Sequence, residues 1–238
     1  MQKNLIKKLI LIESFNWWYV TRREIVLSLT PKNIKSCFEI GAGGGENLLQ
    51  LKKRNIAVSG IDIDEESVNT SISKGLNVKK MDLFKLNFTK KYDLILMMDV
   101  LEHIKNDEAA LQIIKKGLKK EGHLIITVPA FNFLYSAHDK LNHHYRRYAK
   151  TELEKKLLNA GFVIEKITYW NAGLFIPSAI MKVIKSLIPN EKASDLSLLP
   201  PPLNSLLIKI LRMENKLILN KIQMPFGTSI ICVAKIRD

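Results

Sequence analysis

Short apolar runs rich in β-branched residues alternate along this chain with stretches of helical periodicity, and that alternation is what most limits the possible folds. Strands separated by amphipathic helices are joined by crossovers, which build a mostly parallel sheet with helices on both faces. The expected strands are Ser36–Ile40, Ala57–Asp62, Val78–Asp82, Tyr92–Met97, His123–Val128, Val163–Tyr169 and Ser229–Ala234. The expected helices between them are Glu46–Lys53, Glu65–Ser73, Asp107–Lys119 and Thr151–Ala160. The sequence therefore predicts a doubly wound α/β domain around a seven-stranded sheet.

Two regions do not follow the alternation. The N-terminal region looks helical and carries the aromatic cluster Trp17-Trp18-Tyr19. The region between the last two expected strands holds an amphipathic stretch, Leu203–Ile222, whose apolar residues recur at helical spacing. Such insertions commonly form caps or partner surfaces. The expected division is an N-terminal helical lid at 1–30, a core at 31–170 and 229–238, and a helical cap at 171–228.

The charge balance restricts the partners. There are 37 Lys and Arg residues against 23 Asp and Glu, a formal net charge of +14. This excess favours nucleic acid, anionic lipid, or a phosphorylated or carboxylated substrate. Nucleic acid is disfavoured because the lysines are spread along the chain and no RNA-reading motif is present. The basic apolar stretches at 1–12, 174–188 and 203–222 have three interpretations: they cap the pocket, pair with another subunit, or lie on an anionic membrane surface.

Several features bear on location. Cys37 and Cys232 lie in apolar runs, which is typical of buried free thiols in a reducing compartment. The N-terminus lacks the continuous apolar core and cleavage site of a signal peptide. The longest apolar stretch, Ala172–Ile188, is too short and too charged to span a bilayer. We therefore expect a cytoplasmic protein, with peripheral contact at the inner membrane face left open.

A glycine-rich turn, Gly41-x-Gly43-x-Gly45, follows the first expected strand and opens the first helix. Glycine lets the backbone turn sharply and approach a ligand closely. The spacing differs from the G-x-G-x-x-G turn that seats a dinucleotide pyrophosphate, which argues against a nicotinamide-dependent oxidoreductase. The triphosphate motif G-x-x-x-x-G-K-[ST] is also missing from the sequence.

Acidic residues stand at the ends of the first three expected strands: Glu39, Asp62 and Asp82. A carboxylate at the end of the second strand can accept both ribose hydroxyls of a nucleoside. The acid after the third strand is placed to read an adenine amino group. Together with the glycine turn, these acids predict a nucleoside site at one edge of the sheet.

At these residues the sequence resembles the class I S-adenosylmethionine-dependent methyltransferases, whose E/D-x-G-x-G-x-G loop holds the amino-acid part of the cofactor. The resemblance covers residues 35–165, and the last expected strand fits the antiparallel seventh strand of that family. Segments 92–103, 117–129 and 151–162 are also similar to family segments. The resemblance implies that the cofactor is S-adenosylmethionine. The residues that it implies as cofactor contacts are Glu39, Gly41, Gly43, Gly45, Asp62, Ile63, Asp82, Leu83 and Asp99.

The methyl acceptor is expected beside the segment that follows the fifth strand. Methyl transfer needs orientation, and a base where the acceptor loses a proton. Three of the five histidines fall within residues 138–144, next to two arginines and several aromatics. The candidate catalytic residues are His138, His144 and His103, and the candidate substrate contacts are Tyr135, Tyr145 and Arg146, with Arg147 as an alternative anion clamp. In the competing interpretation, His144-x-Arg146-x-Tyr148 packs as part of a lid.

The motif Asp99-x-x-Glu102-His103 also has two interpretations. Two carboxylates and an imidazole at a strand end can ligate a divalent ion, with His138 as a further ligand. The spacing resembles the metal motif of certain metal-dependent O-methyltransferases that act on polyprenyl catechols or RNA ends. In the other interpretation these residues line the pocket or orient the substrate. We favour this second interpretation and expect no metal ion.

The N-terminal aromatics and the arginines behind them, Arg22 and Arg23, either fold over the cofactor or pack on the sheet. The expected function is a methyltransferase that uses S-adenosylmethionine to methylate oxygen of a small or lipid-like, anionic acceptor. The alternatives are an RNA methyltransferase and a non-catalytic cofactor-binding or membrane-surface protein.

Overall fold

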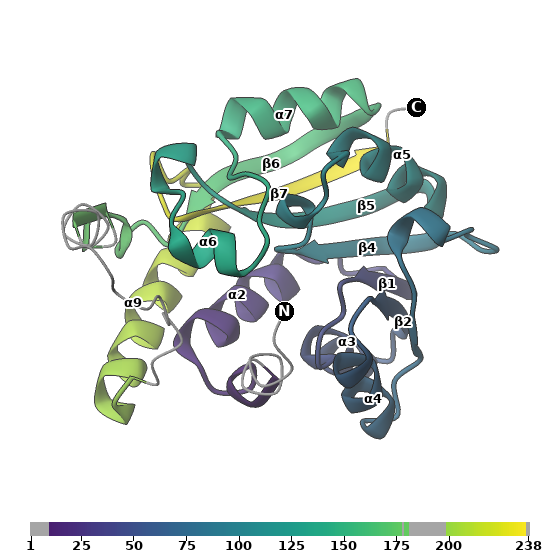
Figure 1. The fold of residues 1–238 in the computed structure, drawn as a ribbon, viewed down its shortest axis with the longest axis horizontal. Coiled ribbons are helices and arrows are strands. Elements are labelled where there is room, and N and C mark those ends of the chain that lie inside the picture. The colour runs from purple at the N-terminus through teal and green to yellow at the C-terminus, as the bar shows by residue number, and fades with distance from the viewer. Residues whose placement is uncertain (1–9, 178, 181–198, 237–238) are drawn as a thin grey trace.

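The computed structural model describes residues 10–177, 179–180 and 199–236, which are built around one seven-stranded sheet (Figure 1). The strand order is β3-β2-β1-β4-β5-β7-β6. Strands β1 to β5 pair in parallel, and β7 is antiparallel to both β5 and β6. The strands are β1 (Ser36–Ile40), β2 (Ala57–Asp62), β3 (Val78–Lys80), β4 (Tyr92–Met98), β5 (Leu118–Pro129), β6 (Phe162–Trp170) and β7 (Ser229–Ile236). The predicted doubly wound, mostly parallel fold is confirmed.

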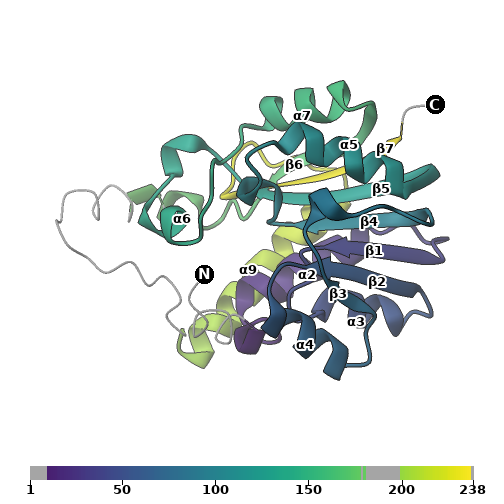
Figure 2. The same ribbon diagram turned by 45° about the vertical axis from the view of Figure 1, so that its right-hand side comes forward.

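The sheet is covered on both faces (Figure 2). Along β4, Leu94 and Leu96 belong to one apolar cluster, and Ile95 and Met97 belong to the other, as the two-residue period of a strand requires. A central parallel strand buried on both faces is continuously apolar, which is why its sequence shows no polar alternation. Helices α3 (Glu46–Lys52) and α4 (Glu65–Ser73) pack in one cluster, and α5 (Asp107–Gly117) and α7 (Lys150–Asn159) pack in the other. Cys37 and Cys232 are both buried free thiols, as predicted.

Several strand ends differ from the prediction, and the end of β3 and the start of β5 are two of them. Strand β3 stops at Lys80 rather than Asp82, because the Asp82 side chain accepts the Phe84 N–H at 2.8 Å and starts a 3-10 helix, η1 (Leu83–Lys85). Strand β5 begins five residues earlier than predicted, at Leu118, which pairs with Tyr92 before the register shifts. A bulge of this kind adds residues without a change in the hydrophobic pattern that would reveal it.

The two regions outside the alternation meet in space. Helix α9 (Pro201–Leu219) lies along α2 (Trp17–Leu29) in both views (Figures 1 and 2). The Trp17 N–H donates to Asn204 at 2.8 Å, and the Asn215 amide donates to the Thr21 carbonyl at 3.0 Å. Residues 1–9 of the predicted lid and 181–198 of the predicted cap lie outside the described residues.

The assignment of residues 1–30 as a lid and 171–228 as a cap stays a prediction. Among the described residues, the helices are either too short or too polar to cross a membrane.

Candidate functional site

The glycine turn forms a backbone cradle that leaves no room for a side chain at Gly41 or Gly45. Gly41, Gly43 and Gly45 all have positive φ, at 71°, 54° and 79°. A Cβ on Gly41 would lie 2.3 Å from Val100 Cγ2, and a Cβ on Gly45 would lie 2.4 Å from Leu76 Cδ1. Only glycine combines that backbone conformation with that closeness. The turn ends at Gly45, which caps α3, so free N–H groups of a helix start lie at the carboxyl edge of β1.

Glu39 lies beneath this turn, at the end of β1. Its side chain is buried, and Oε1 accepts a hydrogen bond from Asn47 Nδ2 at 2.7 Å. Oε2 is buried with no hydrogen-bond partner in the described part of the chain. Burial raises the pKa of Glu39 to about 8, against the lowering effect of the Asn47 hydrogen bond. An orphaned buried oxygen beside a backbone cradle suits a ligand that brings a hydrogen-bond donor.

Asp62 is tied to the same turn. Its Oδ2 accepts the Gly43 N–H at 2.8 Å, and its Oδ1 accepts the Asp64 N–H at 2.9 Å. Burial raises the pKa of Asp62, and these backbone donors oppose the rise. The neighbouring Ile63 is 73% exposed, so its apolar side chain is accessible next to Asp62.

The acid after β3 lies in a different setting. The exposed Asp82 caps the 3-10 helix that follows, and the Leu83 side chain is buried in the core. Of these two residues, the carboxylate of Asp82 and the backbone of Leu83 are therefore the parts that can face a ligand.

Asp99, at the end of β4, is held from two sides. Its Oδ2 accepts a hydrogen bond from Thr127 Oγ1 at 2.9 Å and forms an ion pair with Arg22 of α2. The Arg22 guanidinium lies over the Trp18 ring, 4.4 Å from its centroid, and 5.4 Å from that of Tyr19. The N-terminal aromatics therefore aim Arg22, rather than Arg23, at the carboxyl edge of the sheet.

Sequence reasoning missed Glu13. A Cβ on Gly44 would come within 2.7 Å of Glu13 Oε2, so this carboxyl group lies against the glycine turn. Burial raises the pKa of Glu13 to about 7, with Arg22 as the largest opposing influence. No local motif marks residue 13. The signal is tertiary, because only the fold brings the segment before α2 against the glycine turn.

The segment after β5 is organised around Asp139. Its buried carboxylate contacts His144 Nδ1 at 3.0 Å and Arg147 Nε at 2.8 Å, and it accepts the Ser136 N–H at 2.8 Å. Burial opposes ionisation of Asp139, but these hydrogen bonds outweigh it and hold the pKa below its ordinary value. An ionised carboxylate accepts only, so the Nδ1 atom of His144 carries the proton in this contact.

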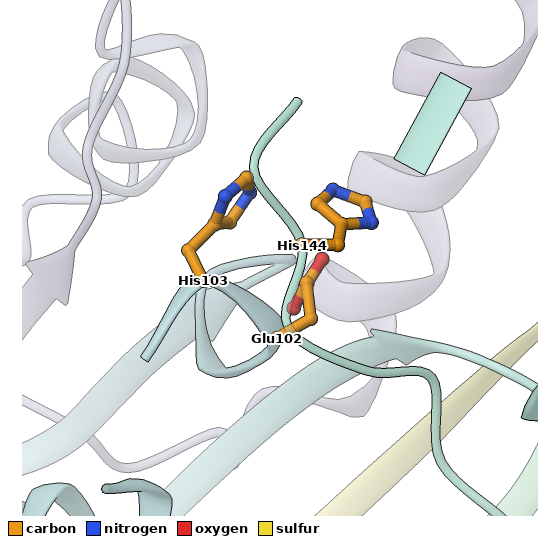
Figure 3. A group of neighbouring side chains, drawn as sticks. All are labelled: Glu102, His103 and His144. Carbon is orange, nitrogen blue, oxygen red and sulfur yellow. The ribbon is translucent and has the colours of Figure 1, made fainter. Parts of the chain in front are cut away.

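His144 lies beside two side chains from the 3-10 helix η2 (Leu101–His103), as Figure 3 shows. The ligating atoms of Glu102, His103 and His144 all lie within 4.8 Å of one another. The two imidazole rings meet edge to face, with centroids 4.5 Å apart. Both carboxyl oxygens of Glu102 are buried without a partner among the described residues.

Charge is disfavoured in this cluster. Burial raises the pKa of Glu102 well above its ordinary value, and the nearby Asp99 is the next largest cause of the rise. Burial and the neighbouring His144 lower the pKa of His103 to about 4. The three side chains could hold a divalent ion, each in its deprotonated form. This set differs from the metal alternative weighed on sequence, because His144 joins Glu102 and His103, whereas Asp99 is engaged by Arg22 and Thr127.

The remaining predicted residues have mainly structural contacts. Arg146 pairs with Asp107 Oδ2 at 3.0 Å, and Asp107 also accepts the Tyr148 hydroxyl at 2.9 Å. The Tyr135 hydroxyl donates to the His144 carbonyl at 2.7 Å. Such contacts are typical of a packing element.

The other two predicted residues are nearer to solvent. Tyr145 is 57% exposed, and its N–H donates to the Glu102 carbonyl at 2.8 Å. His138, in α6 (Ala137–Leu141), lies 3.0 Å from the Asn142 amide through Nε2. Neither side chain joins the cluster of Glu102, His103 and His144.

A doubly wound sheet with a glycine cradle and acids at the strand ends defines a nucleoside-binding α/β protein. The family model described as "Methyltransferase domain" matches residues 20–167, more than half of the chain. The chain therefore belongs to the class I S-adenosylmethionine-dependent methyltransferases. Enzymes of this class transfer a methyl group from S-adenosylmethionine.

Curated relatives agree with this family. The chain is 23% identical over 148 residues to a ubiquinone biosynthesis O-methyltransferase of Rickettsia bellii, covering 54% of this chain and 62% of the relative. It is 30% identical over 105 residues to the protein of the same name from Glaesserella parasuis. That match covers 39% of this chain and 44% of the relative. The chain thus spans less than two thirds of the length of these relatives.

Solved structures share the fold. A SAM-dependent methyltransferase from Archaeoglobus fulgidus superposes with a TM-score of 0.60 at 20% identity, covering 95% of this chain and 98% of that one. A second structure is the phosphoethanolamine N-methyltransferase 2 of Haemonchus contortus, solved with phosphomonomethylethanolamine and S-adenosylhomocysteine. Its TM-score is 0.65 at 14% identity, and the match covers 98% of this chain and 57% of that one. At these identities the likeness shows the fold alone.

Proposed function

We propose that this protein transfers a methyl group from S-adenosylmethionine to an oxygen atom of a small or lipid-like, anionic acceptor. The observation that carries this proposal is the Asp139–His144 pair, an imidazole oriented by a buried carboxylate in the segment after β5. The bound cofactor supplies an electrophilic methyl group on a sulfonium centre. What the protein must add is orientation and a place for the acceptor proton.

The cofactor end of the proposed site fits the residues present. The glycine turn offers free N–H groups at the start of α3, and Glu39 Oε2 is a buried acceptor in need of a donor. We assign the ribose hydroxyls to Asp62, whose carboxylate the Gly43 N–H positions at 2.8 Å. The other proposed contacts are Gly41, Gly45, Ile63, Asp82, Leu83 and Asp99.

We assign the base to His144. Because Nδ1 donates to Asp139, the lone pair of Nε2 is the one that can accept a proton from an acceptor hydroxyl. The ionised Asp139 also stabilises the imidazolium that forms, and Arg147 fixes that carboxylate. His103, with its pKa lowered to about 4, stays neutral beside it.

An anionic, oxygen-bearing acceptor is supported by two further points. The relatives named above carry O-methyltransferase in their names. The net charge of +14 attracts anions. RNA is also an anion, and binding that falls steeply with salt would favour the RNA alternative.

The test compares His144→Asn with His143→Asn. His143 is its exposed neighbour, and asparagine tolerates the φ of 59° found at residue 143. The assay measures S-adenosylhomocysteine release with 3,4-dihydroxybenzoate as an anionic hydroxyl probe. We expect kcat to fall about 100-fold or more in His144→Asn, as for the loss of a general base, and to stay within twofold in His143→Asn.

The affinity for S-adenosylhomocysteine should be unchanged in both variants. Turnover of His144→Asn at the wild-type rate would exclude the base assignment. Transfer to an amine probe or to RNA, with none to hydroxyl probes, would replace the acceptor class.

A further inference from the structure

Helix α9 exposes a narrow apolar stripe to solvent. Its five members are 38% to 68% exposed: Leu203, Leu206, Ile210, Met213 and Leu217. They recur at intervals of three and four residues, which places them along one line of the helix. The buried face is a different one, made of Leu211, Glu214, Asn215 and Ile218. The α9 stripe is therefore not core.

The apolar surface continues from this stripe towards the proposed active site. A Cβ on Gly173 would lie 3.3 Å from Ile210, so the chain after β6 runs beside the stripe. Two residues further on, the Phe175 ring packs 5.3 Å from that of Phe226 and 5.4 Å from that of Phe131. Phe131 directly follows the loop end of β5, where its N–H donates to the Tyr148 carbonyl.

Several side chains in or next to this aromatic cluster are exposed. Phe133 is 70% exposed, Phe226 is 38% exposed, and Ile176, which follows Phe175, is 59% exposed. A soluble monomer rarely leaves so many large apolar groups together in water, and such a surface marks an interaction site.

The edge of the α9 stripe is basic. Lys209 and Lys216 lie along one side of it, exposed and without an acidic partner among the described residues. The single acid of α9, Glu214, is turned inward, where its carboxylate accepts the N–H groups of residues 171, 172 and 173. The stripe therefore presents apolar side chains next to positive charge, and α9 has no exposed acid to balance that charge.

We propose that the α9 stripe, with the aromatic cluster beside it, docks on an anionic lipid bilayer. A bilayer offers both partners that this surface needs, acyl chains for the stripe and negative headgroups for Lys209 and Lys216. A second copy of the chain fits less well, because two stripes packed antiparallel would bring lysine edges together, and α9 has no free acid to offset them. This docking goes beyond the proposed function, since it concerns where the enzyme works rather than which atom it methylates.

The experiment is co-sedimentation of the full chain with vesicles of phosphatidylcholine alone, or mixed with phosphatidylglycerol. We expect binding to the mixed vesicles that weakens with added salt, and little binding to phosphatidylcholine alone. Leu206→Gln/Met213→Gln should weaken binding about 10-fold or more, since it removes two inserted side chains. Lys209→Glu/Lys216→Glu should weaken it about 25-fold or more.

Matched controls carry the same changes elsewhere. Ile72→Gln/Leu158→Gln alters two exposed apolar residues on α4 and α7, and Lys79→Glu/Lys85→Glu alters two exposed lysines at the β3 edge. Both control variants should bind vesicles as the wild type does. An unchanged affinity for S-adenosylhomocysteine in each variant shows that the fold is intact, independently of any acceptor.

Three outcomes would overturn the proposal. The wild type fails to sediment with anionic vesicles, or the stripe variants bind them as well as the controls do. In the third outcome, sedimentation velocity shows that the wild type is a dimer and that the variant Leu206→Gln/Met213→Gln is a monomer. The α9 stripe would then bind a second copy of the chain.

Discussion

Glu39 is the residue of the proposed cofactor site whose ionisation the fold opposes most clearly. It is buried at the end of β1, and its pKa is raised by burial from about 4.5 to about 8. Between those two pH values the folded protein keeps a proton that the unfolded chain has released. The free energy of unfolding therefore falls as the pH rises through that range, and the stabilisation is fully present only below the unfolded pKa.

This linkage predicts the behaviour of Glu39→Gln. The amide keeps an oxygen for Asn47 but has no charge to bury. The melting temperature of the protein without cofactor should rise relative to the wild type at pH 8, and the difference should shrink towards pH 5. Calorimetry at several pH values measures it, with the exposed Glu108→Gln as control. A difference that does not change with pH would show that Glu39 is not the group involved.

Some site residues could be predicted from sequence and others could not, for a physical reason. Glu39 and Asp62 were predictable because parallel strands bring their carboxyl ends to one edge, so position in the pattern fixes position in space. The pairing of Arg146 with Asp107 spans 39 residues, and no local pattern encodes it. The sequence suggested an anion clamp at Arg146, and the structure shows a guanidinium that already has a carboxylate partner.

At the scale of elements, a buried acid, Glu214, joins α9 to the chain that follows β6. The Glu214 carboxylate accepts the N–H groups of Asn171, Ala172 and Gly173 at the end of β6, at distances from 2.6 Å. Burial raises the pKa of Glu214, and these donors lower it. The neighbouring Asn215 accepts the Trp170 indole N–H at 2.8 Å. These contacts hold α9 against the end of β6, and the Asn215 amide holds it against α2 through the Thr21 carbonyl.

Glu214→Ala should therefore be strongly destabilising. It leaves buried backbone donors without an acceptor, which costs about 2–4 kcal/mol in the free energy of unfolding. Urea denaturation measures this cost. Glu24→Ala, which removes the exposed partner of Arg212 on the same helix pair, should cost less than about 1 kcal/mol. Equal costs for the two variants would contradict the anchoring role of Glu214.

The extent of α9 was predictable, but its partner was not. Periodicity predicted a helix at Leu203–Ile222, and the helix runs from Pro201 to Leu219. Its contact with α2 joins residues almost two hundred positions apart, as in the bond from Trp17 to Asn204. Periodicity reports that a helix has an apolar side and does not report what covers it. In α9, periodicity also could not distinguish the apolar residues of the buried face from those of the exposed stripe.

At the scale of the whole molecule, the order of elements carried most of the fold. Alternating strands and helices leave few topologies, because crossovers are right-handed and neighbours in sequence pair in space. The antiparallel β7 was predictable only through the family resemblance, since a single strand after a long insertion could join either edge or the interior of the sheet. It lies between β5 and β6, where it pairs with both.

The central claim is that the glycine turn and the acid after β2 hold the cofactor. Calorimetric titration of the wild type and of Asp62→Ala with S-adenosylhomocysteine tests this claim most directly. We predict one site per chain in the wild type and an affinity at least about 10-fold lower in Asp62→Ala, the effect of losing hydrogen bonds to a charged acceptor. Equal affinities in two folded proteins, or no binding to the wild type, would contradict it.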